Sequence, residues 1–201
     1  MTLPPGFHDV PPGHVPAIVT DLEMRAPAAP RPVPDRPDLA LVPLPRPGLD
    51  LYRGLIRLVG TDWLWQAALA MPDEDLRAAL DDPRVEVSVL RAGDRDAGIL
   101  QLDLRDPGAC EITFFGVARA VEGTGAARWL MNRALRSAWR AGVGRVWLHT
   151  CTLDHPAAPA FYRRTGFEPV RQYVEILPDP RLRGLLPRDA APHVPLAAEE
   201  G

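Results

Sequence analysis

The stretch at residues 117–130, VARAVEGTGAARWL, decides how the rest of the chain is interpreted. It joins an apolar, strand-like run to a helical pattern through two glycines, Gly123 and Gly125. Glycine allows close approach of the backbone, and the first N–H groups of a helix lack intrahelical partners and lie at the positive end of its dipole. The segment therefore predicts a binding site for an anion such as a pyrophosphate.

The helix after this loop is supported by its own pattern. Apolar residues recur along one face of residues 125–141, arginines occupy another face, and glycines at 142 and 144 are expected to end the helix. Two common phosphate loops are excluded. No Gly-Lys-Ser/Thr follows the glycines, and Arg128 stands where a dinucleotide fingerprint requires a small residue. The loop is therefore not expected to bind an NTP or NAD.

A second motif follows at residues 154–167, with the sequence DHPAAPAFYRRTGF. Together the two motifs resemble the acetyl-CoA signature of the GNAT superfamily, Gln/Arg-x-x-Gly-x-Gly/Ala followed by Asn-x-x-Ala-x-x-Leu/Phe-Tyr-x-x-x-Gly-Phe. Two positions depart from it, because Glu122 replaces Gln or Arg and His155 replaces Asn. The resemblance covers residues 85–177. The matching positions are Gly125, Ala127, Ala158, Phe161, Tyr162, Gly166 and Phe167.

The order of the predicted elements agrees with this resemblance. Alternating apolar residues predict strands at 85–90, 99–104, 111–117, 145–150 and 173–177. Helical patterns predict helices at 50–60, 63–71, after Pro72, at 125–141 and at 156–165. This order predicts an α/β (α+β) protein with a mixed sheet and a right-handed crossover between the strands at 111 and 145. The resemblance implies the GNAT fold, a mostly antiparallel twisted sheet with a central, splayed parallel pair, flanked by helices.

The resemblance implies the catalytic residues Tyr162 and Glu111. Tyr162 is expected beside the sulfur of CoA, where a phenol protonates the departing thiolate; a core aromatic is the alternative. A lysine-like amine with a pKa near 10.4 must lose a proton before it attacks. Glu111 occupies the position of the catalytic glutamate of histone-type members, and a solvated glutamate is the alternative. His149 is a second candidate base, with a structural histidine as its alternative.

The resemblance also implies where acetyl-CoA binds. The pyrophosphate is expected on the glycine loop, the pantetheine and thioester between the parallel strands, and the oxyanion on a backbone N–H near residues 115–117. No metal is expected, because the spacing of His149, Cys151 and His155 matches no zinc pattern. The expected cofactor-binding residues are Phe115, Gly116, Val117, Glu122, Gly123, Thr124, Gly125, Ala126, Ala127, His155, Ala158 and Tyr162.

Composition excludes other classes of protein. The net charge of −3 offers no basic stripe for nucleic acid. The chain has neither an apolar stretch long enough to span a bilayer nor a secretory signal at its start, so we expect a cytoplasmic protein without a membrane partner. Its two cysteines are too few for a disulfide framework and are expected to be reduced.

Proline usage suggests the organisation of the chain, since 13 of the 24 prolines lie in the first fifty residues. We expect residues 1–49 to form a proline-rich arm, with strand-like runs at 14–24 and 39–44, packed on the domain. Residues 50–177 are expected to form the acetyltransferase domain. Residues 178–201 are expected to form an extension that closes over the site or mediates dimerisation, so a monomer and a homodimer both remain open.

The sequence therefore predicts an acetyl-CoA-dependent N-acetyltransferase that acts on a primary amine of a small molecule or peptide, by direct attack in a ternary complex. Two alternatives remain open. Glu122 and His155 are compatible with a non-catalytic acyl-CoA-binding module, and the same fold can serve another acyl donor or acceptor. Trp63, Trp65 and Trp147 are candidates for an acceptor pocket or for the core. No residue identifies the acceptor.

Overall fold

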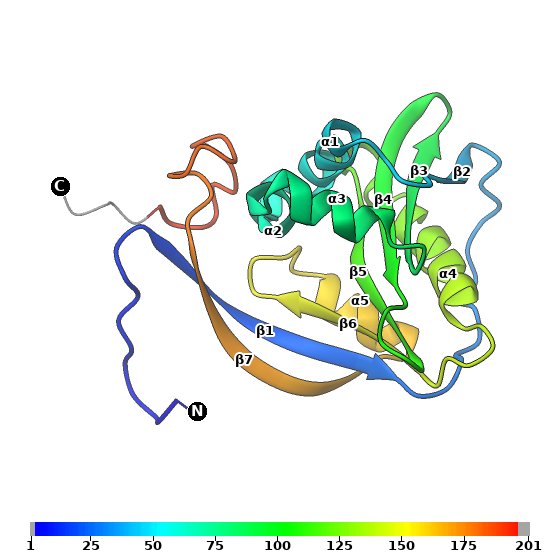
Figure 1. Ribbon diagram of the computed structural model, residues 1–201. Helices are drawn as coiled ribbons and strands as arrows, with labels where there is room; N and C mark the ends of the chain where they lie inside the picture. The colour runs from blue at the N-terminus through cyan, green and yellow to red at the C-terminus, as the bar shows by residue number, and fades with distance from the viewer. Residues whose placement is uncertain (1–2, 197–201) are drawn as a thin grey trace.

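The structure, a computed structural model, describes residues 3–196. Its centre is a seven-stranded sheet with the order β2-β3-β4-β5-β6-β1-β7. All neighbouring strands in this sheet are antiparallel except β5 and β6, which are parallel. Figure 1 shows helices on both sides of the sheet. The predicted fold class, a mostly antiparallel sheet with one parallel pair and flanking helices, is confirmed.

The elements follow one another in the predicted order. Short 3₁₀ turns lie at Thr61–Trp63 and Arg119–Val121. The strands are β1 (His14–Met24), β2 (Leu39–Pro43), β3 (Val85–Ala92), β4 (Arg95–Asp103), β5 (Ala109–Val117), β6 (Arg145–Cys151) and β7 (Glu168–Pro178). The helices are α1 (Leu49–Gly60), α2 (Ala67–Ala70), α3 (Asp73–Asp81), α4 (Ala126–Ala138) and α5 (Ala158–Thr165).

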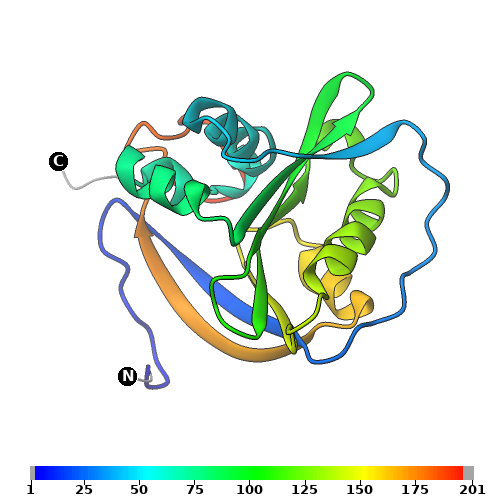
Figure 2. The same ribbon diagram turned by 45° about the vertical axis from the view of Figure 1, so that its right-hand side comes forward.

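Strand β1 lies inside the sheet, between β6 and β7, although it comes first in the sequence. Its central residue Val19 lies opposite Cys151 on β6 and Tyr173 on β7. Strand β7 is longer than the predicted run at 173–177, because it pairs with β1 along almost its whole length. Figure 2 shows these two long strands curving away from the helices. The segment before residue 49 is thus part of the central sheet, while the domain division at residues 49 and 177 stays a prediction.

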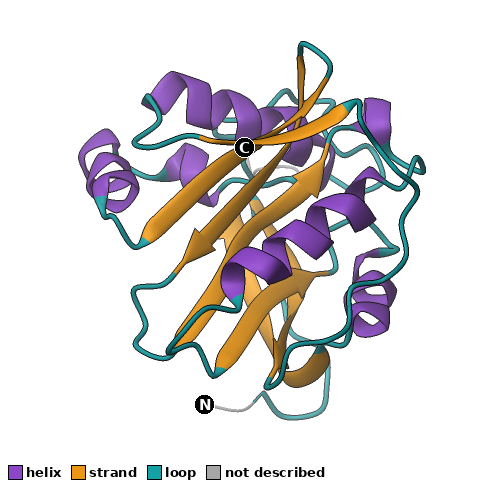
Figure 3. Ribbon diagram, turned by 90° about the vertical axis from the view of Figure 1, so that its right-hand side faces the viewer, coloured by secondary structure: helices purple, strands orange, loops and turns teal. Residues whose placement is uncertain are grey.

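Two apolar cores lie on opposite faces of the sheet. Buried side chains of α4, including Leu130, Met131 and Ala134, pack on one face together with Tyr162 of α5. Figure 3 shows α4 lying across the sheet. On the other face, α1 packs against β4, α3 packs against β3, and α2 packs against α1. The helices after β5 and before β3 therefore cover the central strands from both sides.

The predicted helix at 63–71 is wrong in its first half. Leu64 adopts a left-handed conformation (φ +54°), and only Ala67–Ala70 is α-helical. The cause is Trp65, whose amide donates a hydrogen bond to the carbonyl of Gly60 and whose side chain packs over that glycine. A Cβ at Gly60 would lie 2.4 Å from the Cβ of Trp65. The turn directs Trp65 toward β5, where its ring contacts Phe114.

Helix α4 also ends three residues earlier than predicted, at Ala138 rather than 141. The guanidinium of Arg140 donates hydrogen bonds to the carbonyl of Ser137 and forms an ion pair with Glu86 on β3. A cation that binds one of the last carbonyls of a helix stabilises its end. The tertiary contact with Glu86 therefore ends the helix before the glycines that the sequence suggested.

The segment after β7 is fixed by one buried ion pair. Arg181 and Asp179 are 2% and 3% exposed and lie 2.7 Å apart. Arg181 also donates a hydrogen bond to the carbonyl of Val194 at 2.8 Å, and the amide of Asp179 donates one to the carbonyl of Gly13. Leu186, Ala190 and Ala191 join the core of α1 and α2. Residues 178–196 thus pack against the helices beside the site, while their predicted role in closure or dimerisation stays a prediction.

Candidate active site

Strands β5 and β6 pair only where they begin. Ala109, Cys110 and Glu111 lie opposite the first three residues of β6, and the pairing of the described strands stops there. Strand β5 continues to pair with β4 as far as Val117. Its other edge is therefore open over its second half, and the backbone groups on this edge are available to a ligand.

A cavity of about 410 Å³ lies where the two strands separate. Its volume falls within the roughly 300–1,000 Å³ that is usual for ligand sites. The second half of β5 forms one wall, and His149 and Cys151 of β6 form another. Apolar residues of β1 and the side chains of Trp63 and Trp65 complete it. Two of the three tryptophans that were candidates for an acceptor pocket therefore line the cavity. The third, Trp147, lines a separate, smaller hollow.

The glycine loop leads from β5 into α4 at one end of this cavity. Gly123 and Gly125 have φ values of +71° and +86°, which is the left-handed conformation that glycine adopts most readily. No side chain caps the N-terminus of α4, so its first N–H groups remain open to a ligand. Val33, from the segment between β1 and β2, lies 3.8 Å from the position that a Cβ on Gly125 would take. The predicted anion site therefore has the required backbone geometry.

Most of the expected cofactor-binding residues line the cavity. They are Phe115, Gly116, Val117, Glu122, Gly123, Ala127, His155, Ala158 and Tyr162. Three do not line it: Thr124, Gly125 and Ala126. Thr124 is exposed, and its hydroxyl donates a hydrogen bond to the carbonyl of Val121 while its oxygens accept hydrogen bonds from Arg36. Gly125 and Ala126 form the start of α4, where they shape the loop.

Tyr162 lies in the wall of the cavity on α5 and is 8% exposed. Its ring contacts the rings of Phe115, Phe161 and Phe167, with centroids 5.6–6.2 Å apart. Among the described residues none forms a hydrogen bond with its hydroxyl group, which leaves this group to a ligand. Burial, together with the charge of Asp154, raises the pKa of the phenol, so it stays protonated at neutral pH.

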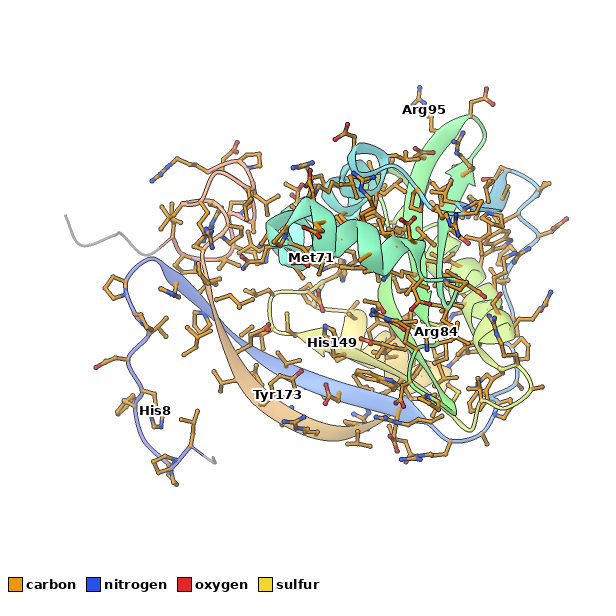
Figure 4. All side chains as sticks on the ribbon, viewed as in Figure 1. His8, Met71, Arg84, Arg95, His149 and Tyr173 are labelled. Atoms are coloured by element: carbon orange, nitrogen blue, oxygen red, sulfur yellow. The ribbon has the colours of Figure 1, made fainter. Side chains whose placement is uncertain are left out.

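Glu111 and His149 meet at the point where the strands diverge. Nδ1 of His149 lies 3.7 Å from Oε1 of Glu111, a distance that suits an ion pair better than a hydrogen bond. The contact with Glu111 raises the pKa of the imidazole and outweighs the partial burial, which lowers it. His149, labelled in Figure 4, lines the cavity, whereas Glu111 lines a separate, smaller hollow together with Trp147. The structure therefore brings both candidate bases together but gives them different positions.

His155 stands beside the start of α5, at the motif position usually held by Asn. Its Nδ1 accepts a hydrogen bond from the backbone N–H of Ala157 at 3.0 Å, and its ring packs against Trp63. Because a neutral imidazole that accepts at Nδ1 carries its proton on Nε2, Nε2 can donate toward the cavity. The side chain therefore offers a donor, as an Asn amide would.

Asp154 is a cavity residue that the sequence motifs did not identify. Its carboxylate accepts hydrogen bonds from Nε1 of Trp65, from the hydroxyl of Thr150 and from the amide of Cys151, at 2.7–3.0 Å. These bonds fix the end of β6 to the turn that contains Trp65. Asp154 comes three residues after the end of β6, and no motif in the sequence pointed to this role.

Cys151 is a thiol that faces this cavity. Burial raises the pKa of its thiol to about 11, and the nearby Asp154 carboxylate contributes in the same direction. The thiol is therefore almost fully protonated at neutral pH, and a protonated thiol is a poor nucleophile.

A parallel pair of strands that separates around a cavity, with a glycine loop and an open helix N-terminus at the same cavity, defines the class of CoA-dependent acyltransferase folds. The chain belongs to the acetyltransferase (GNAT) family, whose sequence profile matches residues 53–167. The resemblance inferred from the two motifs is thereby confirmed.

Solved structures support the same fold. The chain is similar to a functionally unknown conserved protein from Staphylococcus epidermidis (TM-score 0.57, 15% identity, 83% of this chain and 64% of that one). It is also similar to a GCN5-related N-acetyltransferase from Kribbella flavida (TM-score 0.55, 16% identity, 86% of this chain and 63% of that one). A third similar structure is an acetyltransferase from Thermus thermophilus (TM-score 0.52, 22% identity, 71% of this chain and 99% of that one). The chain thus spans less than two thirds of the first two proteins.

No curated protein is significantly similar to the chain in sequence. Across residues 3–196, the helices are all too short or too polar to span a bilayer.

Proposed function

We propose that this protein is an N-acetyltransferase that transfers the acetyl group of acetyl-CoA to a primary amine of a small molecule or peptide. The observation that carries the proposal is one shared cavity, lined by the glycine loop, the open edge of β5, Tyr162 and His149. These are the groups that donor binding, oxyanion stabilisation and proton transfer require. The acceptor enters from the side of β1 and β7, where the cavity is lined by Val15, Ala17 and Glu175.

The donor is held chiefly by backbone groups. The open N–H groups at the start of α4 bind the pyrophosphate, and the free edge of β5 binds the pantetheine arm. Glu122 is exposed, so its carboxylate can remain in solvent instead of facing the phosphates. His155 replaces the Asn donor through Nε2. The two departures from the family motif are therefore compatible with binding of acetyl-CoA.

The reaction proceeds by direct attack of the amine on the thioester. The nitrogen lone pair forms the new C–N bond, a backbone N–H near residues 115–117 stabilises the oxyanion, and the C–S bond then breaks. The nitrogen loses a proton to a base, Tyr162 delivers a proton to the thiolate, and the products are an amide and CoA. An acetyl-cysteine intermediate is disfavoured because the raised pKa of Cys151 keeps this thiol protonated.

His149 accepts the proton from the amine, and Glu111 acts as a positioning residue. His149 lines the cavity, whereas Glu111 does not line it and lies 3.7 Å from Nδ1 of the imidazole. A raised pKa makes the imidazole a stronger base, and the carboxylate stabilises the imidazolium that forms. This arrangement assigns a role to each of the two candidate bases.

The proposal is tested by measuring thiol release from acetyl-CoA with a panel of primary amines, beside calorimetric binding of CoA. Turnover with at least one amine, and identification of the amide product by mass spectrometry, are the expected results. Binding of CoA without turnover on any acceptor would instead support a non-catalytic module. Absence of CoA binding, or CoA binding that Gly125→Asp leaves unchanged, would show that the loop is not a cofactor site.

A further inference from the structure

The segment between β1 and β2 crosses the start of α4 and contacts α5. The backbone of Arg31 exchanges two hydrogen bonds with the side-chain amide of Asn132 on α4, at 2.8 and 3.3 Å. Arg36 donates hydrogen bonds to both oxygens of Thr124, in the glycine loop. Figures 1 and 2 show this segment passing along α4 on its way to β2. The proline-rich segment is thus part of the surroundings of the predicted pyrophosphate site.

Three arginines from three different elements gather where this segment meets α4 and α5. The guanidinium of Arg31 donates a hydrogen bond to the carbonyl of Arg164 at 2.6 Å. Arg128, in the first turn of α4, lies with its guanidinium carbon 4.7 Å from the centre of the Phe161 ring, and it donates a hydrogen bond to the hydroxyl of Thr165. Arg31, Arg128 and Arg164 are hereafter called the arginine cluster.

The arginine cluster has no compensating negative charge within the described chain. No carboxylate of residues 3–196 lies within 4.0 Å of any of its three guanidinium groups, whereas Arg36, a few residues along the same segment, forms an ion pair with Asp38 at 2.6 Å. Burial lowers the pKa of Arg128, and the charges of Arg31 and Arg164 lower it further. Three like charges held together in this way favour an anionic ligand.

The position of the arginine cluster indicates which anion this is. Phe161 lines the cavity and Arg128 covers its ring, so the cluster lies just beyond the cavity at its donor end. Arg128 also belongs to the helical turn whose N–H groups are open for the pyrophosphate. CoA carries a second phosphate, a 3′-phosphomonoester, on the same ribose that bears its pyrophosphate. Arginine binds such a dianionic group through charge-assisted, often bidentate hydrogen bonds.

We propose that Arg31, Arg128 and Arg164 form a subsite for the 3′-phosphate of the CoA donor, with one of the three arginines supplied by the proline-rich segment before β2. The inference rests on the proposed function. It assigns the segment 25–38 a role in donor binding, and it implies that the protein distinguishes CoA from carriers that present phosphopantetheine without the adenosine 3′-phosphate.

The test compares CoA with 3′-dephospho-CoA by calorimetry at low and at high salt. The wild-type protein is expected to bind CoA roughly 10-fold or more tightly, about 1.4 kcal/mol, because each phosphate–arginine contact is charge-assisted. The preference should shrink as salt rises. Arg164→Ala keeps the backbone carbonyl that anchors Arg31, so it removes one charge and leaves the segment in place. Arg164→Ala and Arg128→Ala should each lower the affinity for CoA several-fold and leave that for 3′-dephospho-CoA unchanged.

Arg136→Ala is the matched control, because Arg136 is an exposed arginine at the other end of α4 and the change in net charge is the same. It should retain the full preference for CoA. Equal affinity of the wild type for the two ligands would overturn the subsite and leave the proposed function standing, whereas binding of neither ligand would refute both. An equal loss for both ligands in the Arg164 and Arg128 variants would show that these arginines only support the fold.

Discussion

Replacing Tyr162 by Phe separates a catalytic role of this residue from a structural one. The substitution removes only the hydroxyl group, and the three aromatic contacts of the ring remain. Because the hydroxyl has no hydrogen-bond partner among the described residues, its loss leaves no protein group unsatisfied. The free energy of unfolding should therefore change by less than about 0.5 kcal/mol. Truncation to Ala would instead cost roughly 3–5 kcal/mol and could not be interpreted in the same way.

The expected effect on catalysis is large by comparison. General acid catalysis contributes typically about 10²–10⁴-fold to a rate. The raised pKa of Tyr162 makes it a weak acid compared with a thiol, whose reference pKa is near 8.5, so the lower end of this range applies. We expect Tyr162→Phe to lower kcat by about 100-fold. The loss should be the same between pH 6 and pH 9, because the phenol does not ionise in this interval.

Tyr52 provides a matched control, since it is a second buried tyrosine and lies outside the catalytic groups. Its hydroxyl donates a hydrogen bond of 2.6 Å to the side-chain carbonyl of Gln101, and both residues are buried. Tyr52→Phe leaves this acceptor unsatisfied, which costs about 1–3 kcal/mol. For a chain of this length that lowers Tm by roughly 2–4 °C per kcal/mol. The rate below the unfolding transition should remain that of the wild type.

The assay pairs thiol release from acetyl-CoA with thermal unfolding for each variant. The two substitutions should have opposite effects: Tyr162→Phe loses rate and keeps Tm, whereas Tyr52→Phe loses Tm and keeps the rate. The reasoning is refuted if Tyr162→Phe retains wild-type kcat with a proficient amine. It is equally refuted if Tyr162→Phe unfolds at a lower temperature by as much as Tyr52→Phe, since the hydroxyl would then have a structural partner.

Three further predictions concern the base, the thiol and the segment after β7. Glu111→Gln removes the charge that raises the pKa of His149, so the acidic limb of the kcat/KM profile should move to lower pH; a uniform drop at every pH would make Glu111 itself the base. Cys151→Ala should retain turnover, because the raised pKa of this thiol keeps it protonated. Loss of turnover in this variant would indicate an acyl-enzyme on Cys151. Burial raises the pKa of Asp179, but the hydrogen bonds and charge of Arg181 outweigh burial and lower this pKa below its usual value. The ion pair therefore stabilises the fold above the pKa that Asp179 has in the unfolded chain. This stabilisation disappears as the pH falls through the lower pKa of the folded state. Arg181→Met should cost about 3–5 kcal/mol at pH 7 in denaturant unfolding and less in acid, and an unchanged stability would contradict this.

The glycine loop and the start of α4 could be predicted because their geometry is local. A left-handed glycine and an uncapped helix N-terminus depend on a few consecutive residues, so VEGTGAAR predicts an anion site without any knowledge of the rest of the chain. The motif on α5 was predictable for a similar reason. Its residues predicted a helix, and Tyr162 was identified by the resemblance to the family motif, which also depends on a few consecutive residues.

The local pattern was misleading where a distant contact competed with it. Residues 63–71 have helical periodicity, yet the packing of Trp65 on Gly60 and its hydrogen bond to Asp154 interrupt the helix. The glycines at 142 and 144 suggested the end of α4, yet the ion pair of Arg140 with β3 ends it earlier. Tertiary contacts override propensities of a few tenths of a kcal/mol per residue.

The sequence by itself identified the family and predicted the donor site and the candidate catalytic groups, because these predictions depend on short motifs. Only the tertiary structure decided that β1 lies between β6 and β7, that His149 lines the cavity while Glu111 does not, and that Arg31 reaches Arg164 from 133 residues away. Strand order and register arise from the joint packing of the whole sheet, and a periodic run of apolar residues carries no information about which strand it will join. The glycine loop was therefore predictable from its residues, while the arginine cluster beside it became visible only once three distant segments had met.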